Sequence, residues 1–374
     1  MSGHLVPSLE GVLSSAQVRQ TAASIAAVQQ ADGSIPWSAG APVDVWNHVE
    51  AAMGLLVGGE VEAAEAAYDW CVRTQRPDGS WPMTWAFGEV QDASGETNMC
   101  AYLAVGVWHH WTVRRDLDFV TRTWPAVRRG LDFVVGLQLS SGGIAWSQEW
   151  DDQGPATVNA EALLAGSSSI YQALRAGVAL AALLDEPQPE WELAGGRLGH
   201  ALRQHRDLFL DKSRFSMDWY YPVLGGAVRG QAGLDLVDSR WDDFVVPGLG
   251  IRCVDTNPWV TGAETCELVL ALDCVDQTER ATWLLSAMQH LRDEDGGYWT
   301  GYVYPDEVVW PRELTTYTAA AVILAVDALS RTTPGSGIMR GETLASPFPE
   351  IALECGCPDG ASTGPSSDSV ARGA

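Results

Sequence analysis

The chain has 374 residues, of which 46% are hydrophobic and only 19% charged, so it can fill one large core and is not typical of a disordered chain. Its 48 acidic residues outnumber the 23 Lys and Arg residues, which gives a formal net charge of -25. This charge argues against sequence-independent binding to nucleic acid. No basic and apolar leader or run of ~18 apolar residues occurs, so we expect a cytoplasmic protein without stable membrane insertion.

One phrase recurs along the chain: a helical stretch that ends in Gln, then a turn that contains Gly, then Trp. Clear copies run from Gln30 to Trp37 and from Gln75 to Trp81, and looser ones from Gln138 to Trp146 and from Gln289 to Trp299. In the clear copies Asp-Gly supplies a turn and a left-handed backbone position, and the Trp then packs over the helix end. The phrase therefore marks repeated helix ends.

Two kinds of helix are expected to alternate in chain order. Apolar segments suited to a buried inner layer are expected at 49–57, 99–108, 160–184, 263–272 and 314–329. Amphipathic segments suited to an outer layer are expected at 61–75, 119–139, 190–206 and 279–291. The unit recurs about six times if the weaker region 208–241 counts as one copy. The sequence thus predicts an all-α fold, a single (α/α)6 toroid of about 12 helices over residues 1–331, with an open solenoid as the alternative.

The end of the chain has a different composition. From residue 332 onward the sequence is rich in Gly, Ser, Pro and Ala and has no hydrophobic periodicity. We therefore predict a disordered tail over residues 332–374, whose deletion after Arg331 should be neutral for folding.

The strongest copy of the repeated phrase, from Gln75 to Trp81, resembles the repeat of the squalene cyclase and protein prenyltransferase β-subunit superfamily, where it joins the outer helices of an α/α barrel. The stretches 217–222, 258–261 and 310–317 look like small actinobacterial proteins labelled prenyltransferase by this repeat. The resemblance implies a transferase or cyclase that acts on a small apolar or isoprenoid substrate by acid/base chemistry. The toroid is also similar to that of six-hairpin glycosidases and sugar epimerases.

The chain lacks the catalytic sequence motifs of that superfamily. Trp150-Asp151-Asp152 and Trp241-Asp242-Asp243 lack the first Asp of the cyclase motif Asp-x-Asp-Asp, and no Asp-Asp-x-x-Asp box is present. The nearest match to the prenyltransferase zinc ligands is Glu264-Thr265-Cys266 with His290. We expect no metal and no cofactor, and seven scattered cysteines favour reduced thiols over a disulfide framework.

Loops that enter the inner helices of a toroid gather at one mouth, where residues far apart in sequence can meet. Glu264 and Glu313 begin two of the expected inner helices, where each can be a helix cap or half of an acid/base pair. The catalytic candidates are Glu264, Glu313, Asp151, Asp218 and Asp255. The substrate-binding candidates are Trp150, Trp219, Tyr220, Trp259, Arg252, Tyr317, Trp46 and His48. The same loops carry further polar residues, among them Asn47, Glu50, Glu96 and Asn98.

Three functions compete on this pattern. Aromatic faces can stabilise a carbocation or stack on sugar rings, so the 17 Trp residues suit an isoprenoid enzyme or a carbohydrate enzyme. The repeat favours a prenyltransferase or terpenoid cyclase, which is the main prediction. The carboxylates, and the lack of diphosphate and metal boxes, favour a six-hairpin-type glycoside hydrolase or sugar epimerase. A catalytically silent binding module is the third hypothesis, and all three predict a small-molecule partner.

Overall fold

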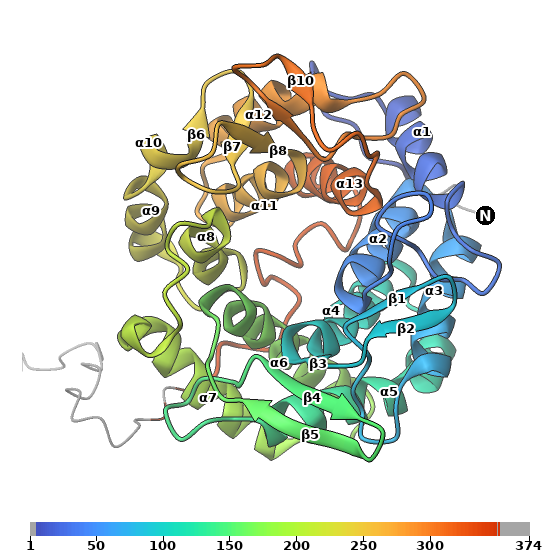
Figure 1. The fold of residues 1–374 in the computed structure, drawn as a ribbon, viewed down its shortest axis with the longest axis vertical. Coiled ribbons are helices and arrows are strands. Elements are labelled where there is room, and N and C mark those ends of the chain that lie inside the picture. Colours follow the sequence, from blue (N-terminus) through green and yellow to red (C-terminus); the bar gives the residue numbers. More distant parts are fainter. Residues whose placement is uncertain (1–4, 350, 352–374) are drawn as a thin grey trace, which may run out of the picture.

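In the computed structural model, which describes residues 5–349 and 351, six helices stand side by side in an inner ring (Figure 1). They are α2 (Val45–Gly58), α4 (Thr97–Arg114), α6 (Leu164–Leu183), α8 (Ser216–Leu224), α11 (Gly262–Asp273) and α13 (Thr316–Ser330). Each helix packs on the next in this order, and α13 packs back on α2. The ring is therefore closed, which rules out the open solenoid, and its helices are buried on nearly all sides because neighbours surround them.

A second layer of helices surrounds the ring. It consists of α1 (Ser15–Ala26), α3 (Val61–Thr74), α5 (Leu117–Gly136), α7 (Pro189–Gln204), α9 (Gly230–Asp238) and α12 (Thr278–Ala287), and short pieces are α10 (Trp241–Phe244), η1 (Arg206–Leu208) and η2 (Met288–Leu291). The outer helices are amphipathic: α5 buries Phe119 and Leu131 and exposes Arg122 and Arg129. The predicted all-α (α/α)6 toroid is confirmed.

Short antiparallel strands precede several inner helices, where the sequence indicated only loops. Strands β1 (Thr84–Ala86) and β2 (Glu89–Asp92) form one hairpin, and β3 (Gly95–Glu96), β4 (Ser147–Asp151) and β5 (Gly154–Asn159) form a sheet in that order. Strands β6 (Val245–Val246), β7 (Gly250–Arg252), β8 (Trp259–Thr261), β9 (Gly301–Val303) and β10 (Val308–Val309) form a five-stranded sheet in the order β10-β9-β8-β7-β6. These sheets hold the loops at the start of the inner helices in a fixed geometry.

The repeated phrase is a turn that ties neighbouring outer helices together. The Gln75 side chain at the end of α3 donates from Nε2 to Gly79 O at 2.9 Å and to Ala126 O of α5 at 2.8 Å. Gly79 has φ +95°, and a Cβ there would lie 2.1 Å from Arg129 O, so only glycine fits this position. Trp81 is 1% exposed and donates from Nε1 to Cys71 O at 2.9 Å. The phrase therefore has a structural role in the outer layer.

Asp78→Ala is expected to lower the free energy of unfolding by about 1 kcal/mol without a selective loss of activity. Asp78 Oδ1 accepts from Ser80 N at 3.1 Å and from Ser80 Oγ at 2.9 Å, and both hydrogen bonds stabilise a turn that lies between outer helices. Thermal melting and the turnover of the folded variant test this expectation together. A variant that stays fully folded but loses turnover would contradict it.

Residues 332–349, here called the C-terminal strap, differ from the predicted disordered tail. The strap crosses the centre of the ring behind the inner helices (Figure 1), at the end where α4, α11 and α13 finish. Ile338 is 3% exposed, and Met339 and Phe348 are 6% exposed. The apolar residues of the strap lack helical spacing because an extended segment meets several helices one after another. Residues 350 and 352–374 of the predicted tail lie outside the described residues.

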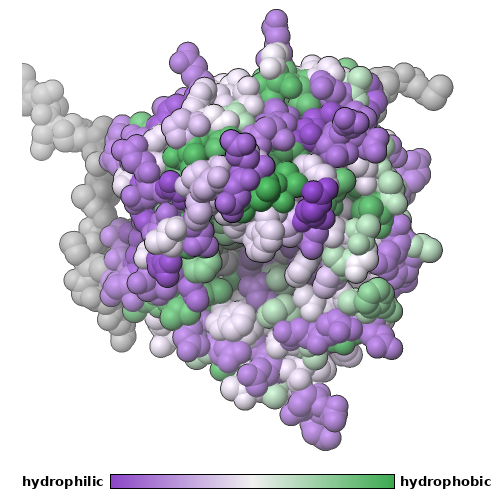
Figure 2. All heavy atoms as spheres, turned by 45° about the horizontal axis from the view of Figure 1, so that its top comes forward, coloured by the Kyte–Doolittle hydropathy of each residue, from purple (hydrophilic) through white to green (hydrophobic). Residues whose placement is uncertain are grey.

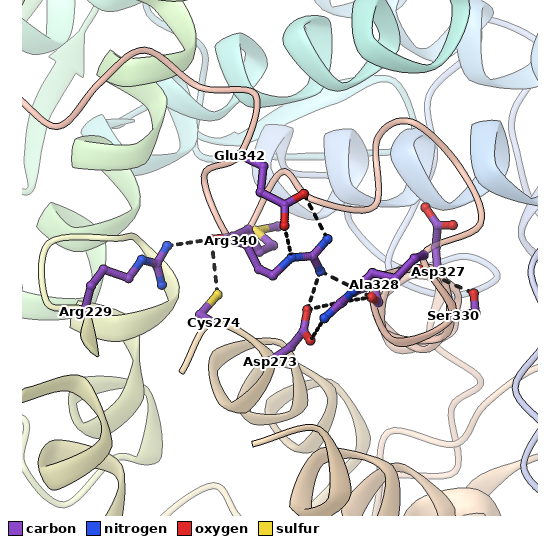
Figure 3. Close-up of polar contacts among 10 residues, drawn as sticks. Arg229, Asp273, Cys274, Asp327, Ala328, Ser330, Arg340 and Glu342 are labelled. Carbon is purple, nitrogen blue, oxygen red and sulfur yellow. Dashed lines mark hydrogen bonds and ion pairs between the residues drawn. The ribbon is translucent and has the colours of Figure 1, made fainter. Parts of the chain in front are cut away.

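Charged contacts fix the middle of the strap. Asp273, at the end of α11, is 1% exposed and pairs with Arg340 of the strap at 2.5 Å and with Arg331 at 2.7 Å. Figure 3 shows Arg340 between Asp273 and Glu342, whose carboxylate it also contacts at 2.6 Å. Arg229 donates to the carbonyl oxygen of Met339 at 2.5 Å. A buried carboxylate with two guanidinium partners makes the strap part of the folded barrel.

Candidate active site

A pocket of about 350 Å³ lies where the inner helices begin. Its lining comes from the first two turns of α2 and α11, from the first turns of α4, α8 and α13, and from the segments that precede these helices. Figure 2 shows a hollow near the centre of the face that it displays, with hydrophilic residues inside it. The lining residues are Trp37, Trp46, Asn47, Glu50, Asn98, Met99, Met217, Trp259, Thr261, Ala263, Glu264, Glu267, Thr300 and Tyr317.

Three carboxyl groups share this pocket. Glu50 projects from α2, and Glu264 and Glu267 are three residues apart on α11, so they lie on the same face of that helix. Glu50 is 4% exposed and Glu267 is 5% exposed, whereas Glu264, in the first turn, is less buried. Glu50 and Glu267 also line a small cavity below the pocket, whose far side is formed by Met339 of the strap. Glu264 is therefore nearer the mouth and the other two form the floor.

The surroundings of the two deep carboxyl groups disfavour their charged forms. Burial raises the pKa of Glu50 well above its usual value, and the nearby charges of Glu267 and Asp44 raise this pKa further. Burial and the charge of Glu264 raise the pKa of Glu267, while the hydroxyl groups of Tyr220 and Tyr221 donate to its carboxylate and oppose this rise. Like charges in one pocket repel one another, so the protonated forms of the two floor carboxyl groups are favoured.

Aromatic and amide side chains form the walls around these carboxyl groups. Trp46 stacks on Tyr102, with ring centroids 4.5 Å apart and 22° between the planes. Asp44, the buried N-cap of α2, accepts from Asn47 Nδ2 at 2.6 Å and from the indole N–H of Trp37. Asp44 therefore fixes two lining side chains while its own carboxylate caps the helix. The pocket thus combines flat apolar faces with polar groups in fixed orientations.

Several of the residues predicted from the sequence meet at this pocket. Glu264, Trp46, Trp259 and Tyr317 line it. Tyr220 lies behind the lining, where its hydroxyl holds Glu267. These residues stand within the first two turns of α2, α8, α11 and α13 or just before them, so the expectation that such positions converge explains why they meet.

The structure places Glu313 outside the pocket, which corrects its predicted position. It is exposed and lies three residues before α13, whose N-cap is Thr315. Glu313 lines a separate hollow of about 340 Å³ together with Trp299 and Arg312. The inner helix starts later than the sequence pattern suggested because Leu314 pairs with Trp299 in a β-bridge before the helix begins.

The three aspartates that the sequence nominated also lie elsewhere. Asp151 is exposed at the turn between β4 and β5, where its Oδ1 accepts from Gln153 N at 2.7 Å. Burial raises the pKa of Asp218 to about 6, but this residue lines a different hollow of about 520 Å³ with Leu210. Asp255 pairs with arginines, 3.2 Å from Arg240 and 3.7 Å from Arg214. Asp151 therefore holds a turn and Asp255 belongs to an ion-pair network, and none of the three aspartates lines the pocket that holds the three carboxyl groups.

Two aromatic candidates from the sequence have packing roles. Trp219 is 3% exposed and stacks on Phe244 at 5.2 Å, so it belongs to the core. Trp150 in β4 lies under the guanidinium of Arg76, which is 4.1 Å from its ring centroid. Neither side chain lines the pocket that holds the three carboxyl groups.

The remaining two candidates are engaged by backbone groups or a distant tyrosine. Arg252 donates to Asp243 O at 2.7 Å and to the hydroxyl of Tyr304 at 3.0 Å. His48 accepts from Ile35 N at 3.0 Å and contacts Ala67 O at 2.8 Å, and burial lowers its pKa to about 4. A buried, neutral histidine with both nitrogens engaged has a structural role.

Sequence reasoning missed Glu50 and Glu267 as catalytic candidates. The sequence pattern places Glu50 among the polar residues of the loops and gives Glu267 no role. Both lie inside segments that are otherwise apolar nearly all round, where a charged residue is unusual without a partner. An isolated Glu in a buried helix, and the spacing of three between Glu264 and Glu267, were the signals that could have found them.

The described part of the chain has neither a metal-binding cluster nor a membrane-spanning helix. Within residues 5–349 and 351, no three His, Cys, Asp or Glu side chains gather as a metal site would require. His290, which the sequence offered as the nearest match to a zinc ligand, instead contacts Leu249 O at 2.9 Å. The helices in the same part of the chain are all too short or too polar to cross a membrane.

The chain resembles known carbohydrate enzymes over nearly its whole length. No protein-family model matches the sequence. It is 54% identical over 352 residues to the MMP endo-(1,4)-3-O-methyl-alpha-D-mannosidase of Mycolicibacterium hassiacum, an alignment that covers 94% of this chain and 96% of that protein.

Two solved carbohydrate enzymes have the same fold. A glycosidase variant in complex with glucose matches with a TM-score of 0.66 at 16% identity, covering 84% of this chain and 96% of that one. The GH63 mannosylglycerate hydrolase from Thermus thermophilus in complex with glucose matches with a TM-score of 0.60 at 12% identity, covering 83% of this chain and 99% of that one. At these identities the two matches show a shared fold.

The prediction of a prenyltransferase or terpenoid cyclase, and with it of a transferase or cyclase reaction, is wrong. It rested on the repeated Gln-to-Trp phrase, and in this chain that phrase is a turn that ties outer helices together. The carboxylate-based alternative agrees better with the relatives. The chain belongs to the glycoside hydrolase family of the MMP endo-(1,4)-3-O-methyl-alpha-D-mannosidase.

Proposed function

We propose that this protein is an endo-acting glycoside hydrolase that cleaves (1,4) linkages between 3-O-methyl-α-D-mannose units. The observation that carries the proposal is the 54% identity to the mannosidase along nearly the full length of both chains. The pocket supports it independently, because glycoside hydrolysis uses a pair of carboxyl groups beside the scissile bond.

Glu50 and Glu264 are the proposed pair. Glu50 is buried, and burial together with the nearby carboxylates raises its pKa and favours the protonated form that a general acid needs to protonate the departing glycosidic oxygen. Glu264 stands in the first turn of α11, where the helix dipole favours a negative charge, and it lies nearer the mouth. As a carboxylate it either activates water or attacks the anomeric carbon, and the anomeric configuration of the first product distinguishes these two mechanisms. Glu267, held by two tyrosines, is a positioning residue.

The pocket wall also suits a methylated sugar. Met99, Met217 and Ala263 add an apolar surface beside Trp46 and Trp259. Methyl ethers remove hydroxyl hydrogens and add apolar area, and such groups gain free energy when apolar atoms cover them. A wall of thioether and indole surfaces therefore favours 3-O-methyl-mannose over mannose.

Met217→Gln is expected to lower kcat/KM for methylated oligosaccharides about fourfold or more relative to unmethylated ones, because one methyl contact contributes about 0.8 kcal/mol. Met217 is partly exposed in the first turn of α8, so the change removes little core packing. Rates on matched methylated and unmethylated oligosaccharides measure the ratio. An equal loss of kcat/KM on both substrates would show that Met217 does not contact the methyl group.

A substrate panel tests the proposed function. The protein is incubated with α-(1,4)-linked oligosaccharides of 3-O-methyl-mannose, of mannose and of glucose, and separately with free mannose, and the products are identified by mass and by NMR. We expect shorter fragments from the methylated mannosides above all. Conversion of free mannose to another monosaccharide, with no fragmentation, would indicate a sugar isomerase or epimerase instead.

A cytoplasmic location is part of the proposal. Five cysteines in the described part of the chain, Cys71, Cys100, Cys253, Cys266 and Cys274, are free, which supports a reducing compartment. Fractionation of the producing cells tests this: recovery of the protein from the culture medium rather than the cytosol would contradict it.

A further inference from the structure

A second tryptophan continues the aromatic wall of the pocket outward. Trp259 is partly buried and lines the pocket, whereas Trp310, which follows β10 directly, is 56% exposed. The two rings meet edge to face, with centroids 5.3 Å apart and 75° between the planes. One indole therefore faces the pocket while its neighbour presents a large apolar surface next to it.

The backbone of Trp310 is fixed on both sides. Its N–H donates to Gly301 O at 2.9 Å, and its carbonyl oxygen accepts from Trp259 Nε1 at 2.7 Å. Both contacts use backbone atoms of Trp310, so they hold the residue in place without using its ring. The exposed indole is thus positioned in advance and loses little conformational freedom when a ligand covers it.

Packing does not explain the exposed ring. The tryptophan of the repeated phrase, Trp81, is 1% exposed and fills the space between helix layers. Trp310 instead leaves more than half of its surface in water, and this exposed part gains nothing from the hydrophobic effect. Because Trp259 connects Trp310 to the pocket, a ligand that extends out of the pocket can cover the exposed ring.

We propose that Trp310 is a stacking platform for a sugar unit of the substrate chain that lies outside the cleavage pocket. This inference rests on the proposed function. An endo-acting enzyme holds its polymer on both sides of the scissile bond, so part of the chain extends beyond the pocket. The C–H face of a sugar packs on an aromatic ring, and 3-O-methyl groups enlarge the apolar area that the ring covers. The platform therefore selects long, methylated chains.

Trp310→Ala tests the platform, with Trp283→Ala as the matched control. Trp283 is also exposed, at 44%, but it stands on the outer helix α12 and does not line the pocket. We expect Trp310→Ala to lower kcat/KM on long methylated chains about three- to tenfold, mainly through KM, and to leave the shortest cleavable oligosaccharide unaffected. Trp310→Phe should restore most of the loss, and Trp283→Ala should change neither substrate.

The outcomes separate this inference from the proposed function. If the unaltered protein cleaves no methylmannose oligosaccharide, the proposed function fails and the platform fails with it. If the unaltered protein cleaves them and Trp310→Ala, with an unchanged melting temperature, treats long and short chains alike, only the platform is refuted. A change in the mass of the protein in solution on Trp310→Ala would show that a second copy of the chain covers the ring, which also refutes the platform.

Discussion

Replacing Glu264 by Gln is expected to lower kcat about 100- to 10,000-fold with little change in substrate affinity. Gln keeps the size and much of the hydrogen bonding of Glu but cannot accept a proton or bear the charge that the reaction needs. Glu264 is partly exposed in the first turn of α11, so the change should preserve the fold. Single-turnover rates and a binding titration with the methylated oligosaccharide measure the two quantities separately.

Two companion variants make this prediction specific. Glu313→Gln should retain the normal rate, because Glu313 is exposed and lines a different hollow. Glu50→Gln should be as slow as Glu264→Gln on the natural linkage but recover much of its rate on an aryl glycoside, whose leaving group needs no proton. Normal turnover of the Glu264→Gln protein would remove Glu264 from the catalytic pair, and equal rescue of both variants would contradict the assigned roles.

Phe348→Ala is expected to destabilise the protein by about 3 to 5 kcal/mol. Phe348 is 6% exposed at the end of the strap and packs edge to face on Tyr171 of the inner helix α6, with centroids 5.6 Å apart. A Cβ at Gly195 would lie 2.2 Å from the Phe348 ring, so α7 leaves room for this side chain. Deletion after Arg331 should cost more still, since it also removes Ile338, Met339 and Arg340.

A phenylalanine at the surface provides the control. Phe87, in the turn between β1 and β2, is 87% exposed, so Phe87→Ala should alter stability by no more than about 0.5 kcal/mol. Urea denaturation of the full-length variants gives both free energies of unfolding. A Phe348→Ala protein as stable as Phe87→Ala would mean that the strap does not stabilise the barrel in solution.

The architecture could be predicted because helix periodicity and helix ends are local signals. Apolar segments such as 263–272 closely match the inner helix α11, and the Gln75 to Trp81 phrase marks the end of α3. The strap could not be predicted in this way. Its buried residues, among them Ile338 and Phe348, contact helices far away in sequence, so no local period connects them.

The site was predicted in part, and for a physical reason. Glu264, Trp46 and Tyr317 were found because residues at the starts of inner helices converge in a toroid. Glu50 and Glu267 lie deeper in α2 and α11. Buried helices are recognised by their apolar residues, so a carboxyl group inside such a helix is easily overlooked as a candidate. The reaction class was missed because the repeated phrase reports the toroid, and one toroid serves several chemistries.

The central claim is that the three-carboxyl pocket hydrolyses an internal linkage of a methylated mannose polymer. The most direct test follows an α-(1,4)-linked 3-O-methyl-mannose oligosaccharide in water enriched in oxygen-18, with rapid quenching and mass analysis of every fragment. We predict fragments of intermediate length that carry one heavy oxygen at the new reducing end, and none with the Glu264→Gln protein. An intact oligosaccharide, or fragments without the label, would contradict the claim.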